Sequence, residues 1–249
     1  MAHEVFHIEP GFEPMLAALG LDSLQGALQC QAALIKDQRG RRDVIRVEAI
    51  TPDGQPLRLF VKRMTRSYLK DGLRTRLIRG SVVSRARIEF ENTLRVIRAG
   101  FAAGRPVAWG EKCGALRERA SVIITAEAEG TPLDQWLACE GAVSRRRRVL
   151  RELGCWLREL HARGIGFPDL FARHVFVNER DRASFCLIDL ARIDFVEGQM
   201  PLAVKARDLA ALHASVPLHR VKLTDRLRVL TAYVPSRSGR RELLRFIRS

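Results

Sequence analysis

The spacing of apolar residues changes character near Gly130, and this change constrains the fold more than any other feature of the chain. Upstream of Gly130, short apolar or alternating runs are separated by turn-forming residues, a pattern typical of β-strands. The runs predicted to be strands are 32–36, 44–50, 57–62 and 121–126. We therefore expect the first half of the chain to form a small antiparallel sheet.

Helical periodicity marks three other parts of the chain. Over 84–100 the apolar residues share one face of a predicted helix, and Glu89 lies beside that face. A longer apolar stripe over 144–164 predicts a core helix, with Ser144 as its candidate cap. The segment 202–249 is expected to form short helices.

A second hairpin is expected in the downstream half, where apolar runs at 175–177 and 185–188 flank a turn at 178–182. Asp189 follows the second run directly. A carboxylate at the exit of an apolar hairpin costs free energy unless a metal or a hydrogen-bond donor meets it. This position favours a functional Asp189 over a residue that only ends a strand.

The length of 249 residues and the hydrophobic content of 47% are enough to bury a core in one compact unit or in two small lobes. The change of pattern near Gly130 favours two lobes. We expect an α+β, bilobal fold. Its predicted parts are an N-lobe over 1–129, with strands and one helix, and a mainly helical C-lobe over 130–249.

The chain is strongly basic, because 43 Lys and Arg residues outweigh 28 Asp and Glu residues and give a formal charge of +15. Such a charge attracts anionic membrane surfaces, nucleic acids or phosphorylated substrates. Two clusters stand out, Arg145–Arg148 and the arginines between 237 and 248. Each is either a solvated helix surface or a contact for anionic lipid headgroups.

Cysteine spacing and hydropathy favour a cytoplasmic protein. The 5 cysteines are far apart in the chain, which argues against a zinc site and against a disulfide framework. Residues 1–10 lack the basic and then apolar pattern of a secretory signal, and the stretch 15–35 is too polar to span a membrane. Any membrane contact is expected to be peripheral.

Charged and polar residues follow one another in the order that phosphoryl transfer requires. Lys62 ends the third predicted strand, and Glu89 follows on the next helix. Asp169, His174 and Asp189 come later in the chain, with the hairpin between the last two. Kinases place a lysine, a helix carboxylate, a catalytic-loop Asp, a metal-binding polar residue and a metal-binding Asp in this order.

Each of these residues also has a plainer interpretation. Lys62 alone would be a solvated side chain at a strand end, and Asp169 alone would be a turn residue after a proline. His174 would be a hydrogen-bonded structural histidine, since magnesium prefers oxygen ligands. Glu91 competes with Glu89 for the carboxylate role. Because the residues occur together and in order, we favour the catalytic interpretation.

The same segments resemble the lipopolysaccharide kinase (Kdo/WaaP) family within the protein-kinase-like superfamily. The similarity covers roughly residues 20–215, the size of one catalytic domain. It lies in Lys62 and in the segments 87–91, 160–164, 169–174, 187–192 and 205–212. In this family His commonly stands where protein kinases have Asn, so His174 matches the pattern. Asp208 matches an Asp that supports the catalytic loop.

The resemblance implies transfer of a phosphoryl group from ATP, with Mg²⁺, to a sugar hydroxyl. The implied acceptor is a heptose or Kdo of the lipopolysaccharide core at the cytoplasmic face of the inner membrane. Adenine is expected on the backbone near Ala126 to Ala128, and backbone amides around Gly40 are expected to cradle phosphates. Phe167 and Pro168 depart from the His and Arg that kinases usually have before the catalytic Asp.

Two other functions stay open at this point. One is a protein kinase, which would phosphorylate a polypeptide. The other is a silent pseudokinase, a regulatory scaffold or a basic protein that binds nucleic acid. Retention of Lys62, Asp169 and Asp189 together argues against a silent protein. The sequence contains no recognised nucleic-acid-binding module, so a nucleic-acid partner rests on charge alone.

Overall fold

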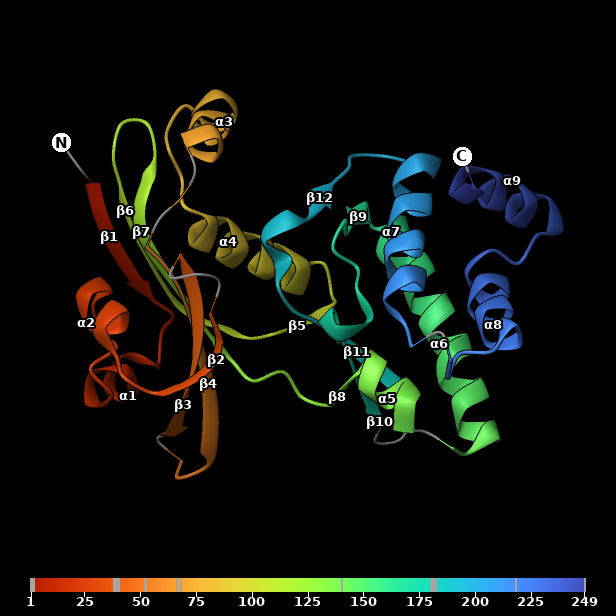
Figure 1. Cartoon of the computed structure of the whole chain (residues 1–249), viewed down its shortest axis with the longest axis horizontal. Helices are drawn as coiled ribbons and strands as arrows, with labels where there is room; N and C mark the ends of the chain where they lie inside the picture. Colours follow the sequence, from red (N-terminus) through yellow and green to blue (C-terminus); the bar gives the residue numbers. More distant parts are fainter. Residues whose placement is uncertain are drawn as a thin grey trace. The chain divides into compact units, whose positions relative to one another are not determined.

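The computed structural model describes residues 3–37, 41–51, 53–65, 67, 69–139, 141–179, 183–217 and 219–248. The chain forms two compact units. Unit 1 comprises Met1–Arg95 and Gly104–Glu127, and unit 2 comprises Val96–Ala103 and Ala128–Ser249. Unit 1 is built on a sheet and unit 2 is mainly helical (Figure 1). The predicted domain division after residue 129 stays a prediction.

The sheet of unit 1 is antiparallel throughout, with the strand order β1-β6-β7-β4-β3-β2. The strands are β1 (His3–Ile8), β2 (Ala33–Asp37), β3 (Arg42–Ile50), β4 (Pro56–Met64), β6 (Pro106–Cys113) and β7 (Glu118–Ala126). The strands expected at 32–36, 44–50, 57–62 and 121–126 are therefore confirmed as β2, β3, β4 and β7. The edge strand β1 and the hairpin partner β6 were not expected.

Helices cover both faces of this sheet. They are α1 (Glu13–Ala18), α2 (Leu24–Gln29), α3 (Leu69–Arg79) and α4 (Arg85–Arg98). Leu16 of α1 and Leu24 of α2 are buried in one cluster with Ile124 of β7. Phe90 of α4 is buried in another cluster with Ile123, the neighbouring residue on the same strand. Because successive strand residues point to opposite faces, α1 and α2 pack on one face and α4 packs on the other.

Unit 2 combines helices with short strands. Its helices are α5 (Leu133–Cys139), α6 (Val143–Ala162), α7 (Leu202–Ser215), α8 (Leu223–Tyr233) and α9 (Arg237–Arg248). One sheet has the order β5-β11-β10-β8, formed by Ala102–Ala103, Ala183–Leu187, Val175–Glu179 and Thr131–Pro132. β9 (Ile165–Gly166) pairs with β12 (Asp194–Phe195). The expected core helix, hairpin and C-terminal helices are confirmed.

Two local predictions in unit 2 were wrong. The cap of α6 is Ala142 in extended conformation, with no side-chain hydrogen bond, and Ser144 lies inside the first turn. Asn178 belongs to strand β10, where it pairs with Ser184, so it is not a turn residue. The last part of the expected turn, 180–182, lies outside the described residues. No helix in the described part of the chain is long and apolar enough to cross a membrane.

Gly164 ends α6 and starts the segment that leads to the predicted catalytic loop. Its φ angle is +72°, in the left-handed region that favours glycine. A Cβ atom at this position would stand 2.1 Å from the carbonyl oxygen of Val196, which lies just past β12. The N–H of Val196 also donates to the carbonyl oxygen of Gly164 at 2.8 Å. Both the backbone angle and the close approach therefore require glycine here.

We predict that Gly164→Ala destabilises the protein more than Gly198→Ala. Gly198 has a similar φ of +78°, but a Cβ atom there would meet nothing within 4 Å. The left-handed backbone should cost about 1 kcal/mol in both variants, and the clash should add about 1–3 kcal/mol only at Gly164. Urea unfolding measures both free energies. Equal losses would show that the approach to Val196 does not constrain the fold.

Candidate active site

Lys62 and Glu89 form an ion pair inside unit 1. Lys62 lies on β4, and its Nζ atom donates to Oε1 of Glu89 on α4 at 2.5 Å. Both side chains are mostly buried, so Lys62 is not the solvated strand-end lysine of the plainer interpretation. Glu91 instead meets Arg79 and Arg87 at the helix surface, at 2.6 and 2.8 Å. The structure thus brings together Lys62, which was predicted to hold the ATP phosphates, and Glu89, which was predicted to orient Lys62.

Two buried carboxylates anchor the start of α4. The N–H of Ser84 donates to Oε2 of Glu111 at 2.9 Å, and the N–H of Arg85 donates to Oε2 of Glu118 at 3.2 Å. The Ser84 hydroxyl accepts from the N–H of Arg87 at 3.1 Å and so caps the helix. Negative charge at a helix N-terminus also complements the helix dipole. Glu111 and Glu118 therefore fix the helix that carries Glu89.

Burial raises the pKa of Glu118 above its ordinary value. Hydrogen bonds from Ser121 and from the N–H of Arg85 oppose this shift in part, and the charge of Glu111 adds to it. A carboxyl group with a raised pKa binds its proton more readily in the folded protein than in the unfolded chain. Its contribution to stability is therefore full below the unfolded pKa and falls as the pH rises through the folded pKa.

Asp208 of α7 organises the loop that precedes the predicted catalytic Asp. It is fully buried, and its Oδ2 accepts from the N–H of Phe167 at 2.5 Å, while Oδ1 accepts from Arg207 at 2.8 Å. The Nε2 atom of His161 lies 3.3 Å from Oδ2, and its Nδ1 lies 2.6 Å from the hydroxyl of Tyr233. Helices α6, α7 and α8 therefore all hold this loop through one polar cluster.

This cluster gives a physical reason for the departure at Phe167. The bond to Asp208 comes from the backbone N–H of Phe167, so it does not depend on the side chain at that position. The phenyl ring is fully buried and lies over the ring of His174, with 6.3 Å between centroids and 26° between planes. An apolar residue can therefore stand here without loss of the loop anchor.

Asp169, His174 and Asp189 lie in one cluster of unit 2. The Nδ1 atom of His174 is 2.8 Å from the backbone oxygen of Asp169, and its Nε2 is 3.9 Å from Oδ2 of Asp189. Because a carbonyl only accepts hydrogen bonds, Nδ1 carries the proton, and Nε2 is the nitrogen that faces Asp189. The structure therefore places these three predicted residues together.

Asp189 has the only positive φ among the non-glycine residues that the structure describes, at φ 60° and ψ 54°. A left-handed non-glycine residue costs on the order of 1–3 kcal/mol and tends to occur at functional sites. The turn η2 (Leu190–Arg192) follows, and Nη1 of Arg192 donates to Oδ1 of Asp169 at 2.9 Å. This contact was not predicted, although Arg192 ends the segment 187–192 that carries Asp189.

The donor set around Asp189 suits magnesium better than a transition metal. Among the described residues, no group of three or more His, Cys, Asp or Glu side chains is placed to hold a metal ion. Zinc would need such a group, whereas Mg²⁺ is often held by one or two carboxylates together with phosphates and water. Asp189 fits a magnesium ligand of this kind, with His174 beside it.

Three other residues, Gly40, Ala126 and Ala128, were predicted to contact the nucleotide. Gly40 lies outside the described residues. In unit 1 the N–H of Ala126 donates to the carbonyl oxygen of Arg105 at 2.8 Å, so it is already used within the sheet region. Ala128, the first residue of the second segment of unit 2, is buried. Adenine contact near Ala126 and Ala128 stays a prediction, carried by groups other than this N–H.

The basic run Arg145–Arg148 makes structural contacts at the start of α6. Arg145 and Arg148 lie 2.7 and 3.9 Å from the carboxylate of Glu179. Arg146 meets Asp225 of α8 at 3.1 Å. These acidic partners offset the unfavourable effect of positive charge at a helix N-terminus. At least three of these arginines therefore tie α6 to its neighbours.

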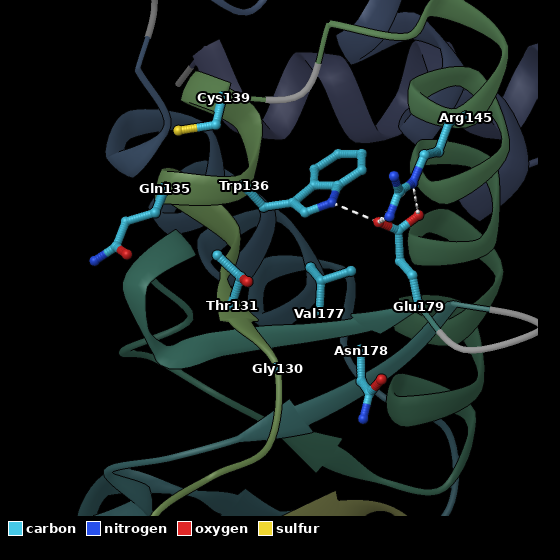
Figure 2. A pocket seen from close by; sticks show the side chains of 9 residues that line it. All are labelled: Gly130, Thr131, Gln135, Trp136, Cys139, Arg145, Val177, Asn178 and Glu179. Atoms are coloured by element: carbon cyan, nitrogen blue, oxygen red, sulfur yellow. Dashed lines mark hydrogen bonds and ion pairs between the residues drawn. The ribbon is translucent and has the colours of Figure 1, made fainter.

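A cavity of about 460 Å³ in unit 2 lies beside this run (Figure 2). Figure 2 shows the indole of Trp136 and the guanidinium of Arg145 directed at Glu179, and the indole nitrogen donates to that carboxylate at 2.8 Å. The cavity is lined by Gly130, Thr131, Gln135, Trp136, Cys139, Arg145, Val177, Asn178 and Glu179. None of the predicted catalytic or metal-binding residues lines it.

Comparison with known proteins places the chain in a family. The model of the lipopolysaccharide kinase (Kdo/WaaP) family matches residues 26–233. The chain belongs to this family. A solved structure described as WaaP in complex with acyl carrier protein is similar to it, with a TM-score of 0.67 and 23% sequence identity. That similarity covers 97% of this chain and 92% of the other.

These comparisons confirm the family and the protein-kinase-like fold that the sequence predicted. The Kdo/WaaP family is a kinase family, so the chain is a phosphotransferase, and membership of a kinase family implies the use of ATP. The family description assigns it the function of a lipopolysaccharide kinase. A search of curated proteins gives no significant match.

We predict that Glu118→Gln flattens the dependence of stability on pH. The amide keeps an acceptor for the N–H of Arg85 but carries no charge. Between about pH 5 and pH 8, the wild type should lose stability that the variant retains, because only the wild type must keep a buried carboxylate ionised. Urea unfolding at both pH values measures the difference.

The matched control for Glu118→Gln is Glu91→Gln. Partial burial opposes ionisation of Glu91, but hydrogen bonds from Arg79 and Arg87 hold its pKa below the ordinary value. Both folded and unfolded states then ionise Glu91 throughout this pH range, so the pH dependence should match the wild type. The same pH dependence in Glu118→Gln and wild type would contradict the interpretation.

Proposed function

We propose that this kinase transfers the γ-phosphoryl group of ATP to a hydroxyl of a heptose or Kdo sugar in the lipopolysaccharide core. The observation that carries the proposal is the cluster of Asp169, His174 and Asp189, with Asp189 in a left-handed conformation, in a member of the lipopolysaccharide kinase family. A loop carboxylate and a hairpin-exit carboxylate are the two acidic groups that phosphoryl transfer needs.

Lys62 is the proposed phosphate-binding group of unit 1. Its ammonium donates to Glu89, which fixes its position on the sheet before ATP binds. An ammonium held in this way is an electrostatic partner for the α- and β-phosphates. Glu111 and Glu118 support Lys62 indirectly. They bind backbone N–H groups at the start of α4 and so position the helix that carries Glu89.

Asp189 is the proposed magnesium ligand of unit 2. The carboxylate of Asp189 would hold Mg²⁺, which would supply positive charge next to the phosphoryl group during transfer. The Nε2 atom of His174 lies 3.9 Å from Oδ2 of Asp189, so the imidazole either supports this carboxylate or contacts a phosphate. The proton that Nδ1 donates to the backbone of Asp169 fixes the orientation of the ring.

Asp169 is the proposed group that orients the acceptor hydroxyl and accepts its proton late in the transfer. Arg192 donates to Oδ1, which holds the carboxylate in one orientation. The second oxygen, Oδ2, is then the atom that we assign to the hydroxyl. The backbone of the loop is held through Phe167 by Asp208, so the position of Asp169 depends on a rigid support.

The proposed acceptor also suggests where the protein works. A formal charge of +15 suits an anionic glycolipid and the anionic surface of the cytoplasmic membrane. We place the enzyme in the cytoplasm, in peripheral contact with the inner face of that membrane. A similar solved structure contains acyl carrier protein. We therefore propose acyl carrier protein as a second partner of this chain, to be tested by a binding assay.

The direct test is phosphate transfer from labelled ATP, with magnesium, to extracted core lipopolysaccharide that lacks phosphate. We expect Asp169→Ala and Asp189→Asn each to reduce transfer at least about 100-fold, since each removes a group that acts on the reacting atoms or their metal. The matched control is Asp22→Asn, because Asp22 is exposed on unit 1 and belongs to no predicted site.

Transfer to the core sugar that depends on both aspartates, in variants that remain folded, would support the proposal. Label that appears on a polypeptide and not on the glycan would move the assignment to a protein kinase. Transfer to the glycan that survives Asp189→Asn would contradict the role of Asp189. Circular dichroism and thermal unfolding check that the variants fold.

A further inference from the structure

Helix α3 of unit 1 turns large aliphatic side chains towards solvent. The exposed fractions are 46% for Leu73, 87% for Leu77 and 71% for Ile78. Leu73 and Leu77 are four residues apart, so they lie on one side of the helix, and Ile78 is next to Leu77. Scattered single apolar residues are common on protein surfaces, but several on adjacent positions of one helix indicate an interaction site.

The opposite side of α3 is fixed to the body of unit 1. A Cβ atom on Gly72 would stand 2.3 Å from the carbonyl oxygen of Leu116 in the β6–β7 turn, so the helix approaches this turn closely. Arg76 donates to the carbonyl oxygen of Ala115 at 3.0 Å, and Arg79 meets Glu91 of α4 at 2.6 Å. Figure 1 shows α3 next to the β6–β7 hairpin. These contacts set which side faces out.

An arginine accompanies the aliphatic side chains of α3. Arg74 is exposed and lies between Leu73 and Leu77 on the outer side of α3. On the neighbouring turn, Leu116 is 51% exposed, and Arg117 and Arg119 are exposed. We call Leu73, Arg74, Leu77 and Ile78 the α3 face.

Leucine and arginine side by side on one exposed surface match the interface of a bilayer. Aliphatic side chains enter the boundary of the acyl chains, while guanidinium groups stay with the anionic headgroups. A protein partner would have to bury Arg74 among aliphatic residues, which is costly unless a carboxylate meets it. The combination therefore favours an anionic lipid surface over an apolar protein groove.

Other basic or apolar surfaces of the chain fit a membrane less well. The run at 145–148 is tied to Glu179 and Asp225, as described above. Helix α9 buries Leu243 in the core of unit 2. Among the α9 side chains that the structure describes, the exposed ones include Arg241 and Arg245 and no large aliphatic residue. Leu34 and Ile35 are exposed on β2, but neighbouring strand residues point to opposite faces.

We propose that the α3 face inserts into the anionic surface of the membrane that carries the acceptor. The inference rests on the proposed function, because a lipid-linked glycan is presented at such a surface. Docking through α3 would hold the enzyme where its acceptor is concentrated. The chemistry recognised is that of anionic phospholipid headgroups above acyl chains.

The test uses the full chain and vesicles of two compositions, phosphatidylethanolamine with phosphatidylglycerol and pure phosphatidylcholine. The double variant Leu73→Ser, Leu77→Ser should bind the anionic vesicles about 10-fold or more weakly in a sedimentation assay. Arg74→Gln should weaken binding to the anionic vesicles and leave any binding to phosphatidylcholine unchanged. The matched control is Leu34→Ser, Ile50→Ser, which removes aliphatic residues that are 60% and 69% exposed elsewhere in unit 1.

Transfer assays with two acceptors separate this inference from the proposed function. We expect the double variant to phosphorylate soluble core oligosaccharide as the wild type does, and to lose activity on lipopolysaccharide held in vesicles. Vesicle binding that survives the double variant, or falls equally in the control, would overturn the membrane role of α3 while leaving the kinase assignment intact. Failure to phosphorylate either acceptor, with vesicle binding still dependent on α3, would overturn the proposed core-sugar acceptor alone.

A protein partner is the remaining outcome. The wild type could fail to bind either kind of vesicle and instead bind purified acyl carrier protein through Leu73 and Leu77. In that case the α3 face is a protein-binding surface and the membrane proposal is wrong. Thermal unfolding of the double variant and its control confirms that both remain folded. Because the replaced side chains are exposed, neither variant should lose core packing.

Discussion

The buried carboxylate of Asp208 is the interaction on which the candidate site of unit 2 depends. A charge without solvent contact is tolerated only when donors meet it. Here the N–H of Phe167 and the guanidinium of Arg207 donate to it, and the imidazole of His161 lies 3.3 Å away. Removing one donor would leave one oxygen of this buried carboxylate without a hydrogen bond. The loop before Asp169 therefore has a strong energetic reason to keep one conformation, and catalysis by positioned groups requires that rigidity.

In unit 1, buried carboxylates also fix a backbone segment, here the start of α4. Glu111 and Glu118 are buried and bind backbone N–H groups at the start of α4, as Asp208 binds the N–H of Phe167. In each case an acidic side chain fixes a backbone segment, and that segment carries a functional residue. Buried carboxylates thus support both Glu89, which pairs with Lys62, and Asp169, which is assigned to the acceptor hydroxyl. In each case they bind the backbone of the segment that carries the residue.

The sequence predicted those parts of the site that follow a fixed order along the chain. Lys62 and Glu89 could be found because a strand-end lysine and a helix carboxylate precede the two loop aspartates in kinases. Glu111 and Glu118 could not, because an isolated glutamate on a strand gives no indication that it is buried against a helix terminus. Arg192 lay inside a recognised segment, but only the turn after Asp189 brings it to Asp169.

The fold was predictable to a similar degree and for similar reasons. Alternating strands such as β3 and β4 have a clear periodicity, whereas β1 mixes histidine and glutamate with apolar residues and becomes a strand by pairing with β6. The cap at Ser144 was wrong because the acidic partners Glu179 and Asp225, far away in sequence, stabilise the arginine-rich start of α6. Helix α3 was missed because its aliphatic residues face solvent.

The roles of Lys62 and Asp189 are the central claim, and a crystal structure with magnesium and a non-hydrolysable ATP analogue tests it most directly. The account predicts Nζ of Lys62 within about 2.7–3.2 Å of a phosphate oxygen and a magnesium ion on the carboxylate of Asp189. A nucleotide bound away from Lys62, or a metal ion held by other carboxylates while Asp189 contacts neither metal nor phosphate, would contradict it.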